Sequence, residues 1–94
     1  MNISITGCIN NPGEYTFQSK CSLKEAIDFA GGIKEGKNFK PSGLIILKQR
    51  LSKTNSKLLK EINFIQEPKV LETETIKDDL IVIIQLDDNY YEND

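Results

Sequence analysis

Few residues in this chain have the side chains that catalysis or metal binding usually needs. The 94 residues include no histidine, so the commonest general base and the commonest metal ligand are both missing. Serine–histidine and cysteine–histidine nucleophiles are excluded for the same reason. Cys8 and Cys21 lie in neither a metal-type nor a redox-type spacing, which favours two free thiols over one disulfide. The composition therefore predicts a protein that is not an enzyme and that holds no cofactor or metal.

Two short motifs resemble ligand sites, but chain geometry explains them better. Asp78 and Asp79 directly precede a hydrophobic run, where a turn is expected, and an oxygen-ligand metal site needs several more converging ligands. Gly31 and Gly32 follow a helical pattern, whereas a dinucleotide-binding fingerprint has three spaced glycines that open a helix. We expect the acidic pair to form a turn and the glycine pair to end a helix.

Charge is distributed unevenly along the chain. Residues 34–60 hold eight basic residues and one acidic residue, a local charge of +7, while the residues from Glu61 onward carry −8. Such a basic segment can bind an anionic polymer through contacts that weaken with salt. The alternative is that these lysines are ordinary solvated residues, balanced in space by the acidic half. Only one aromatic residue, Phe39, lies in the segment, so nucleic acid ranks below polysaccharide as a partner.

Five residues are candidates for contacting a ligand. Lys48 and Arg50 belong to the basic segment and follow a hydrophobic run. Asn10, Asn11 and Tyr15 cluster around a turn, where the amides can hydrogen-bond a sugar and the aromatic ring can stack on it. The alternative for this second group is that the asparagines serve the turn and that Tyr15 packs in the core.

The first of the elements that would position these side chains is a β-hairpin over residues 1–18. Apolar and polar residues alternate on both sides of a turn that contains Pro12 and Gly13. Gly7 stands on the apolar side of the first strand. A glycine in that place usually marks a bend or the close approach of another group.

A short helix is predicted to begin at Leu23. Ser22 and Glu25 have the spacing of a capping box, in which each side chain bonds to the backbone of the other residue. The apolar stripe of this helix consists of Leu23, Ala26, Ile27 and Ala30. A helix this short is marginal in water, so we expect the stripe to lie on a sheet.

The second half of the chain contains two hydrophobic runs, residues 44–47 and 80–84, which predict well-buried strands in the middle of a sheet. The pattern of residues 51–75 suggests a helical turn in one place and a strand in another. We therefore expect an irregular excursion that ends in a short edge strand near residues 70–75. No run is long enough to cross a membrane, so direct membrane insertion is not expected. The elements predict an α+β domain of two layers over residues 1–86, with an acidic tail at residues 87–94.

This order of motifs resembles the soluble-ligand-binding β-grasp domains of bacterial polysaccharide-export proteins. In that family a strand ending in glycine leads through a proline–glycine turn to an aromatic residue, and a capped helix then closes on Ala-Gly-Gly. The matching residues here are Gly7, Ile9, Pro12, Gly13, Tyr15, Ser22, Leu23, Ala26, Ile27, Ala30, Gly31 and Gly32. Residues 45–50 and 76–83 resemble two later strands of the family. The chain departs from the pattern at Asp78, where the family usually has glycine, and residues 51–75 have no clear counterpart.

The resemblance implies a ubiquitin-like β-grasp fold, with a mixed sheet of four to five strands and one main helix packed on one face. It also implies a non-catalytic ligand-binding or assembly domain of a capsule or exopolysaccharide export system. Its partners would be polysaccharide or neighbouring subunits, with homo-oligomers possible in the full-length protein. The domain would be periplasmic or otherwise extracytoplasmic as part of a longer exported chain, and cytoplasmic if these residues are the whole protein.

Two alternatives to polysaccharide export remain open at this point. One is a purely structural interaction domain in a larger complex. The other is a domain of the kind found in DNA-uptake receptors, although the helix–hairpin–helix unit that normally accompanies it is not among these residues.

Overall fold

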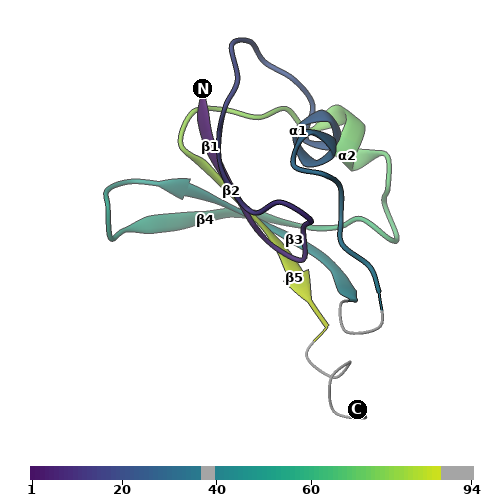
Figure 1. Ribbon diagram of the computed structural model, residues 1–94. Helices are drawn as coiled ribbons and strands as arrows, with labels where there is room; N and C mark the ends of the chain where they lie inside the picture. Colours follow the sequence, from purple (N-terminus) through teal and green to yellow (C-terminus); the bar gives the residue numbers. More distant parts are fainter. Residues whose placement is uncertain (37–39, 88–94) are drawn as a thin grey trace.

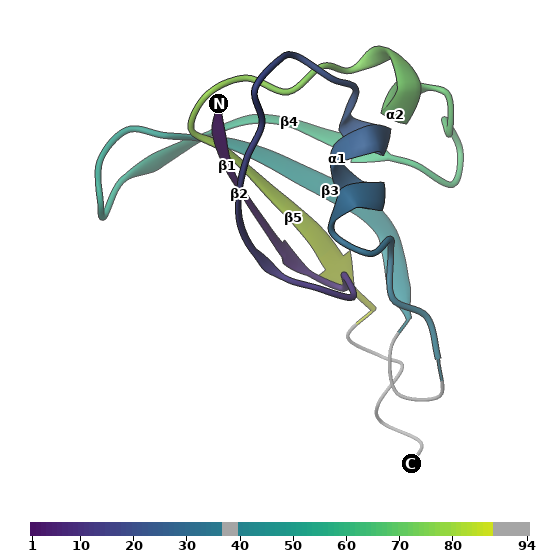
Figure 2. The same cartoon turned by 45° about the horizontal axis from the view of Figure 1, so that its top comes forward.

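The computed structural model describes residues 1–36 and 40–87, which form a mixed sheet with helices on one face (Figures 1 and 2). The sequence predictions for residues 37–39 of the basic segment, including Phe39, and for residues 88–94 of the acidic tail lie outside the described residues. Within the described ranges, no helix has the length and apolar character of a membrane span.

The predicted hairpin is confirmed. Strands β1 (Asn2–Gly7) and β2 (Gly13–Thr16) pair antiparallel, with Ile3 opposite Tyr15. Gly7 has a φ of 90°, and a Cβ atom at this position would lie 2.1 Å from the carbonyl oxygen of Ile84. The close approach that the sequence indicated at Gly7 is therefore made by the backbone of another strand.

Helix α1 (Leu23–Phe29) begins where the sequence predicts. The Ser22 hydroxyl accepts the Glu25 amide at 3.1 Å, and the Glu25 carboxylate accepts the Ser22 amide at 3.2 Å. The helix ends at Ala30, and the left-handed φ angles of Gly31 and Gly32 then turn the chain away. The whole predicted stripe is buried, since α1 lies across one face of the sheet (Figure 2).

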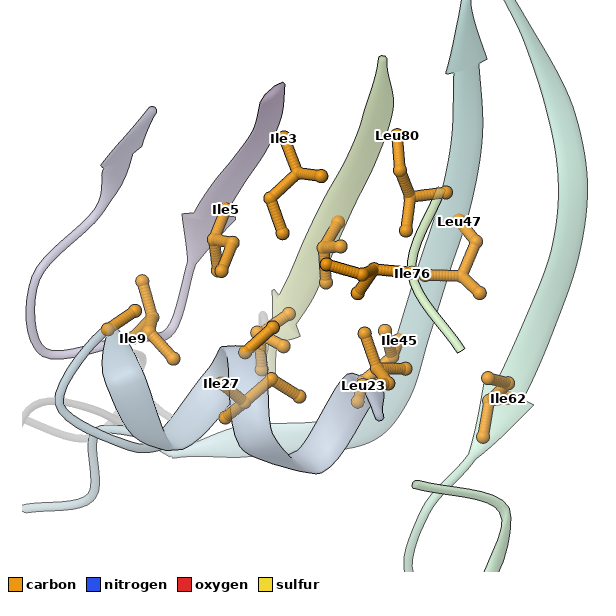
Figure 3. Packing of buried hydrophobic residues seen from close by; sticks show 14 of the residues in the cluster. Ile3, Ile5, Ile9, Leu23, Ile27, Ile45, Leu47, Ile62, Ile76 and Leu80 are labelled. Carbon is orange, nitrogen blue, oxygen red and sulfur yellow. The ribbon is translucent and has the colours of Figure 1, made fainter. Parts of the chain in front are cut away.

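The two hydrophobic runs lie in β3 (Pro41–Arg50) and β5 (Leu80–Leu86). With the edge strand β4 (Ser56–Asn63), the strand order is β2-β1-β5-β3-β4, and β5 runs parallel to β1 and antiparallel to β3. The predicted central positions are confirmed. The core between sheet and helix, part of which is drawn in Figure 3, consists of Ile3, Ile5, Cys8, Ile9, Leu23, Ala26, Ile27, Ala30, Ile45, Leu47, Ile62, Ile76, Leu80, Val82 and Ile84.

Among residues 1–36 and 40–87, helices cover one face of the central strands. Their buried residues on the helix side are Ile45, Leu47, Leu80, Val82 and Ile84. The apolar residues on the opposite face, which we call the open face, are Leu44, Ile46, Ile81 and Ile83, and all four are partly exposed. Within residues 1–36 and 40–87 both helices lie on the same side of the sheet (Figure 2), as a two-layer domain requires.

The prediction for residues 51–75 is wrong in its details. The edge strand is β4, and the segment predicted as a strand contains a short helix, α2 (Val70–Thr73). A register shift leaves Leu59 as an extra residue between the Leu58–Lys48 and Lys60–Leu47 pairs, so β4 lacks the simple alternation that marks a strand in sequence. Val70 and Leu71 are both partly buried beside α1, an arrangement that one helical turn allows and an alternating strand does not.

Candidate ligand-binding site

Asn10 and Asn11 attach the hairpin to the end of α1. The side-chain amide of Asn10 donates to the carbonyl oxygens of Gly31 at 2.8 Å and Gly32 at 3.2 Å, and its backbone amide also donates to Gly32 at 3.0 Å. The backbone amide of Asn11 donates to the Ala30 carbonyl at 2.9 Å. The Asn10 side-chain donors are thus occupied within the protein, whereas Asn11 takes part in this attachment through its backbone amide.

Gly31 allows this attachment. Its φ is 90°, and a Cβ atom there would lie 2.6 Å from the Asn11 side-chain nitrogen and 3.0 Å from the Asn10 Cβ. A larger residue would therefore push the hairpin away from the helix as well as strain the backbone. The two residues before the proline–glycine turn thus meet the Ala-Gly-Gly end of the helix, and both the turn and the helix end are motifs of the family resemblance.

Three aromatic rings gather beside this junction, and we call them the aromatic patch: Tyr15, Phe17 and Phe29. Phe29 receives Tyr15 edge-to-face at a centroid distance of 5.8 Å and Phe17 at 5.5 Å. The Tyr15 hydroxyl donates to the Asn11 carbonyl oxygen, which fixes the Tyr15 ring against the hairpin turn. Phe29 nevertheless remains 68% exposed. Tyr15 and Phe17 are partly buried against the core, so Phe29 is the ring of the patch that is open to solvent.

Sequence reasoning named Tyr15 but missed Phe29 and Phe17. The available signal was that Phe29 falls outside the apolar stripe of α1 and so had to face away from the core. Two neighbouring rings hold Phe29 in place, which reduces the side-chain entropy that a bound ligand would otherwise have to remove. Flat aromatic faces of this kind attract the polarised C–H groups of ligands such as sugar rings.

Lys48 and Arg50 lie at the end of the sheet opposite to the Asn10 turn. Gly7, which leads into the Asn10 turn, pairs with Ile84, whereas Gln49 pairs with Leu80. Four residues along β5 separate the two pairs, a distance of roughly 13 Å. The structure therefore brings Asn10, Asn11 and Tyr15 together and keeps Lys48 apart from the Asn10 turn, whereas Arg50 lines a hollow together with Tyr15.

The surroundings of Arg50 are not strongly basic. Its guanidinium pairs with the Glu14 carboxylate at 3.0 Å. A shallow hollow of about 310 Å³ beside the pair is also lined by Asp79, so that one positive and two negative groups face it. The local charge of −1 disfavours an acidic polymer in this hollow. Lys48 forms no ion pair within residues 1–36 and 40–87.

The acidic pair, Asp78 and Asp79, forms a turn, and the two cysteines are not bridged. The Asp78 carboxylate accepts the Asn2 amide at 2.7 Å, and Asp79 has a φ of 61°, as expected for a turn before β5. Cys8 and Cys21 are both free thiols, and burial raises the pKa of each. No group of three potential metal ligands is found in the part of the chain that the structure describes.

Comparison of the chain with models of known protein families and with curated protein sequences gave no match.

Proposed function

We propose that this chain is a non-catalytic β-grasp domain of the soluble-ligand-binding kind, which serves as a glycan-binding or assembly module in the export of a surface polysaccharide. The observation that carries the functional part is the aromatic patch, an exposed phenylalanine held by two further rings beside the hairpin–helix junction.

The β-grasp assignment is supported by the chain topology. The sheet order β2-β1-β5-β3-β4 places the first and last strands side by side and parallel, with hairpins towards both edges. The main helix α1 connects the first hairpin to β3 and packs on one face.

A glycan is the ligand class that suits the aromatic patch. The patch presents the exposed ring of Phe29, and stacking on such a ring favours uncharged rings with C–H groups. The Arg50 hollow, with its local charge of −1, gives little support to an acidic polymer. We therefore place the polysaccharide at Phe29 and Tyr15 rather than at Lys48 and Arg50.

The proposed setting is extracytoplasmic, as one module of a longer exported chain. The open face supports contact with neighbouring subunits, since contiguous apolar side chains on a sheet surface are commonly covered by another protein. A purely structural interaction domain, which binds no glycan, is the second candidate, and the same open face favours it.

The test compares two polysaccharides and three variants. A neutral glucan such as dextran should bind weakly and independently of salt, and Phe29→Ala should weaken this binding by roughly tenfold, because one stacked aromatic contributes on the order of 1 kcal/mol beyond its area. Leu51→Ala is the matched control, since Leu51 is 61% exposed and distant in sequence from the patch. Circular dichroism of each variant verifies that the fold is retained.

The variant K48E/R50E separates the two modes of binding. It should bind the neutral glucan as the unchanged protein does. If only an acidic polysaccharide such as alginate binds, and salt or K48E/R50E abolishes that binding, the aromatic patch is not the site. If neither polymer binds at low salt while a neighbouring subunit is captured, the structural interaction domain is the better description.

A further inference from the structure

The open face of the sheet contains a contiguous group of aliphatic side chains. Its four apolar residues on β3 and β5 are partly exposed, on the side of the sheet that faces away from both helices (Figure 2). Leu58 of the edge strand β4 extends the group, because it pairs with Lys48 of the same face and is 56% exposed. Contiguous apolar side chains on a surface commonly mark a site of contact with another protein.

The register between the strands arranges these residues in rows, and we call the result the open-face array. Ile46 lies at its centre, with Ile83 beside it on β5 and Glu61 beside it on β4. Lys48 lies in the next row, with Leu58 beside it on β4. The members of the array are Leu44, Ile46, Lys48, Leu58, Glu61, Ile81 and Ile83.

The array contains one basic and one acidic residue, Lys48 and Glu61. They belong to neighbouring strands and neighbouring rows, so they lie diagonally across from each other. Neither of them forms an ion pair within residues 1–36 and 40–87, whereas Arg50, the next residue on this side of β3, pairs with Glu14 at 3.0 Å. The open-face array is therefore neutral in sum and has one charge of each sign to offer, which suits contact with a copy of itself.

We propose that two copies of this domain pair through their open-face arrays, about a two-fold axis that lies between the two sheets and passes over Leu58 and Ile46. A two-fold interface brings together the same patch of both copies, so residues on the axis meet their own equivalents. Ile46 thus meets Ile46 of the second copy. Exchange across the axis brings Lys48 opposite Glu61 of the second copy, and the reverse pair forms at the same time.

The same axis satisfies the apolar residues. It places Ile83 of one copy over Leu44 of the other, so that apolar side chains meet on both sides of Ile46. Neighbouring strands are about 4.8 Å apart, and alternate residues of a strand about 6.7 Å. Because these spacings are similar, a diagonal axis turns the strands of the two copies to roughly a right angle. Orthogonal packing is one of the two usual arrangements of stacked sheets.

The size of the face indicates a weak dimer. Five strands and the seven residues of β5 give a face of roughly 24 by 23 Å, so a pair buries on the order of 1,100 Å² in total. Interfaces of this size are at the lower end of specific ones, and we expect a micromolar Kd. The inference rests on the assembly role in the proposed function, whereas the glycan site at Phe29 lies on the helix side of the sheet and does not depend on it.

Analytical ultracentrifugation of the whole chain over micromolar to millimolar concentrations tests the proposal, and reversible dimer formation is the expected result. K48E places two carboxylates together at both ion pairs of the dimer, and E61K places two ammonium groups there. Each variant alone should dimerise at least tenfold more weakly, because two pairs are reversed at once. An equal mixture of the two variants should form a heterodimer, since every carboxylate then faces an ammonium group.

The matched control is K57E, which makes the same change of charge at an exposed lysine on the helix side of β4. It should dimerise as the unchanged protein does, and circular dichroism verifies that each variant is folded. The proposal is wrong if the unchanged protein is monomeric at every concentration, or if K57E weakens the dimer as much as K48E does. A mixture of K48E and E61K that stays monomeric, or an open face that captures only a different subunit, would also overturn it.

Dextran binding separates this proposal from the glycan site. K48E should bind dextran as the unchanged protein does, because Phe29 is on the opposite face. Dextran binding by a chain that does not dimerise would refute the dimer and leave the proposed glycan site intact. A dimer that binds no dextran would count against the glycan site alone.

Discussion

The replacement Gly7→Ala tests the contact that joins the first and last strands. The backbone of Gly7 has a φ of 90°, and an added Cβ would lie 2.1 Å from the Ile84 carbonyl oxygen, closer than non-bonded atoms can approach. The same oxygen accepts the amide of Cys8 at 2.7 Å. Alanine therefore has to strain the backbone and also move β1 away from β5.

The two effects can be given separate magnitudes. A left-handed backbone costs a residue with a Cβ about 1–2 kcal/mol. The displacement of β1 adds the loss of at least one buried hydrogen bond, about 1 kcal/mol, together with core packing. A total of about 3 kcal/mol is a large share of the roughly 5–15 kcal/mol that stabilises such a domain, and it lowers the melting temperature by about 12 °C or more.

Gly32→Ala isolates the backbone effect. Gly32 has a similar φ of 83°, but nothing lies within 4 Å of the position of its Cβ. Urea unfolding followed by circular dichroism should give a loss of about 1–2 kcal/mol for Gly32→Ala and at least 1 kcal/mol more for Gly7→Ala, with equal m-values. Equal losses in the two variants would refute the close approach of Gly7 to Ile84.

Three further measurements concern the helix start and the thiols. Ser22→Ala removes the hydroxyl that accepts the Glu25 amide, so urea unfolding should report a loss of about 1 kcal/mol, and an unchanged stability would contradict the capping box. Iodoacetamide should modify the partly exposed Cys21 slowly and the buried Cys8 only on unfolding. Because burial raises the pKa of both thiols above the ordinary 9.0, deprotonation favours the unfolded chain, and stability should fall as the pH rises past that value. Equal labelling rates in native buffer would contradict the burial of Cys8.

The candidate sites were only partly predictable from the sequence. Tyr15 was named because its residue type and its place near a turn are local properties. Phe29 was missed, since its exposure depends on how α1 sits on the sheet and on which rings surround it. The open-face array could not be predicted from the sequence, because Ile46, Glu61 and Ile83 become neighbours only in the folded chain.

Local patterns determined the elements whose cause is local. Alternation with a proline–glycine turn is sufficient for the first hairpin, and the capping box with its apolar stripe is sufficient for α1. The central positions of β3 and β5 also follow from their composition, because continuous apolar runs are stable only where neighbouring strands pair on both sides. These interactions span a few residues, and the sequence contains them directly.

Tertiary contacts decided the remainder. Residues 56–63 form an edge strand because they pair with the free edge of β3. A register shift interrupts the alternation of apolar and polar residues that would have marked this strand in the sequence. Val70 and Leu71 turned into a helix because both could then pack beside α1. Which face of the central strands is covered depends on the side to which the helices cross. None of these outcomes is a property of a short segment, because each depends on the free energy of contacts between residues far apart in the sequence.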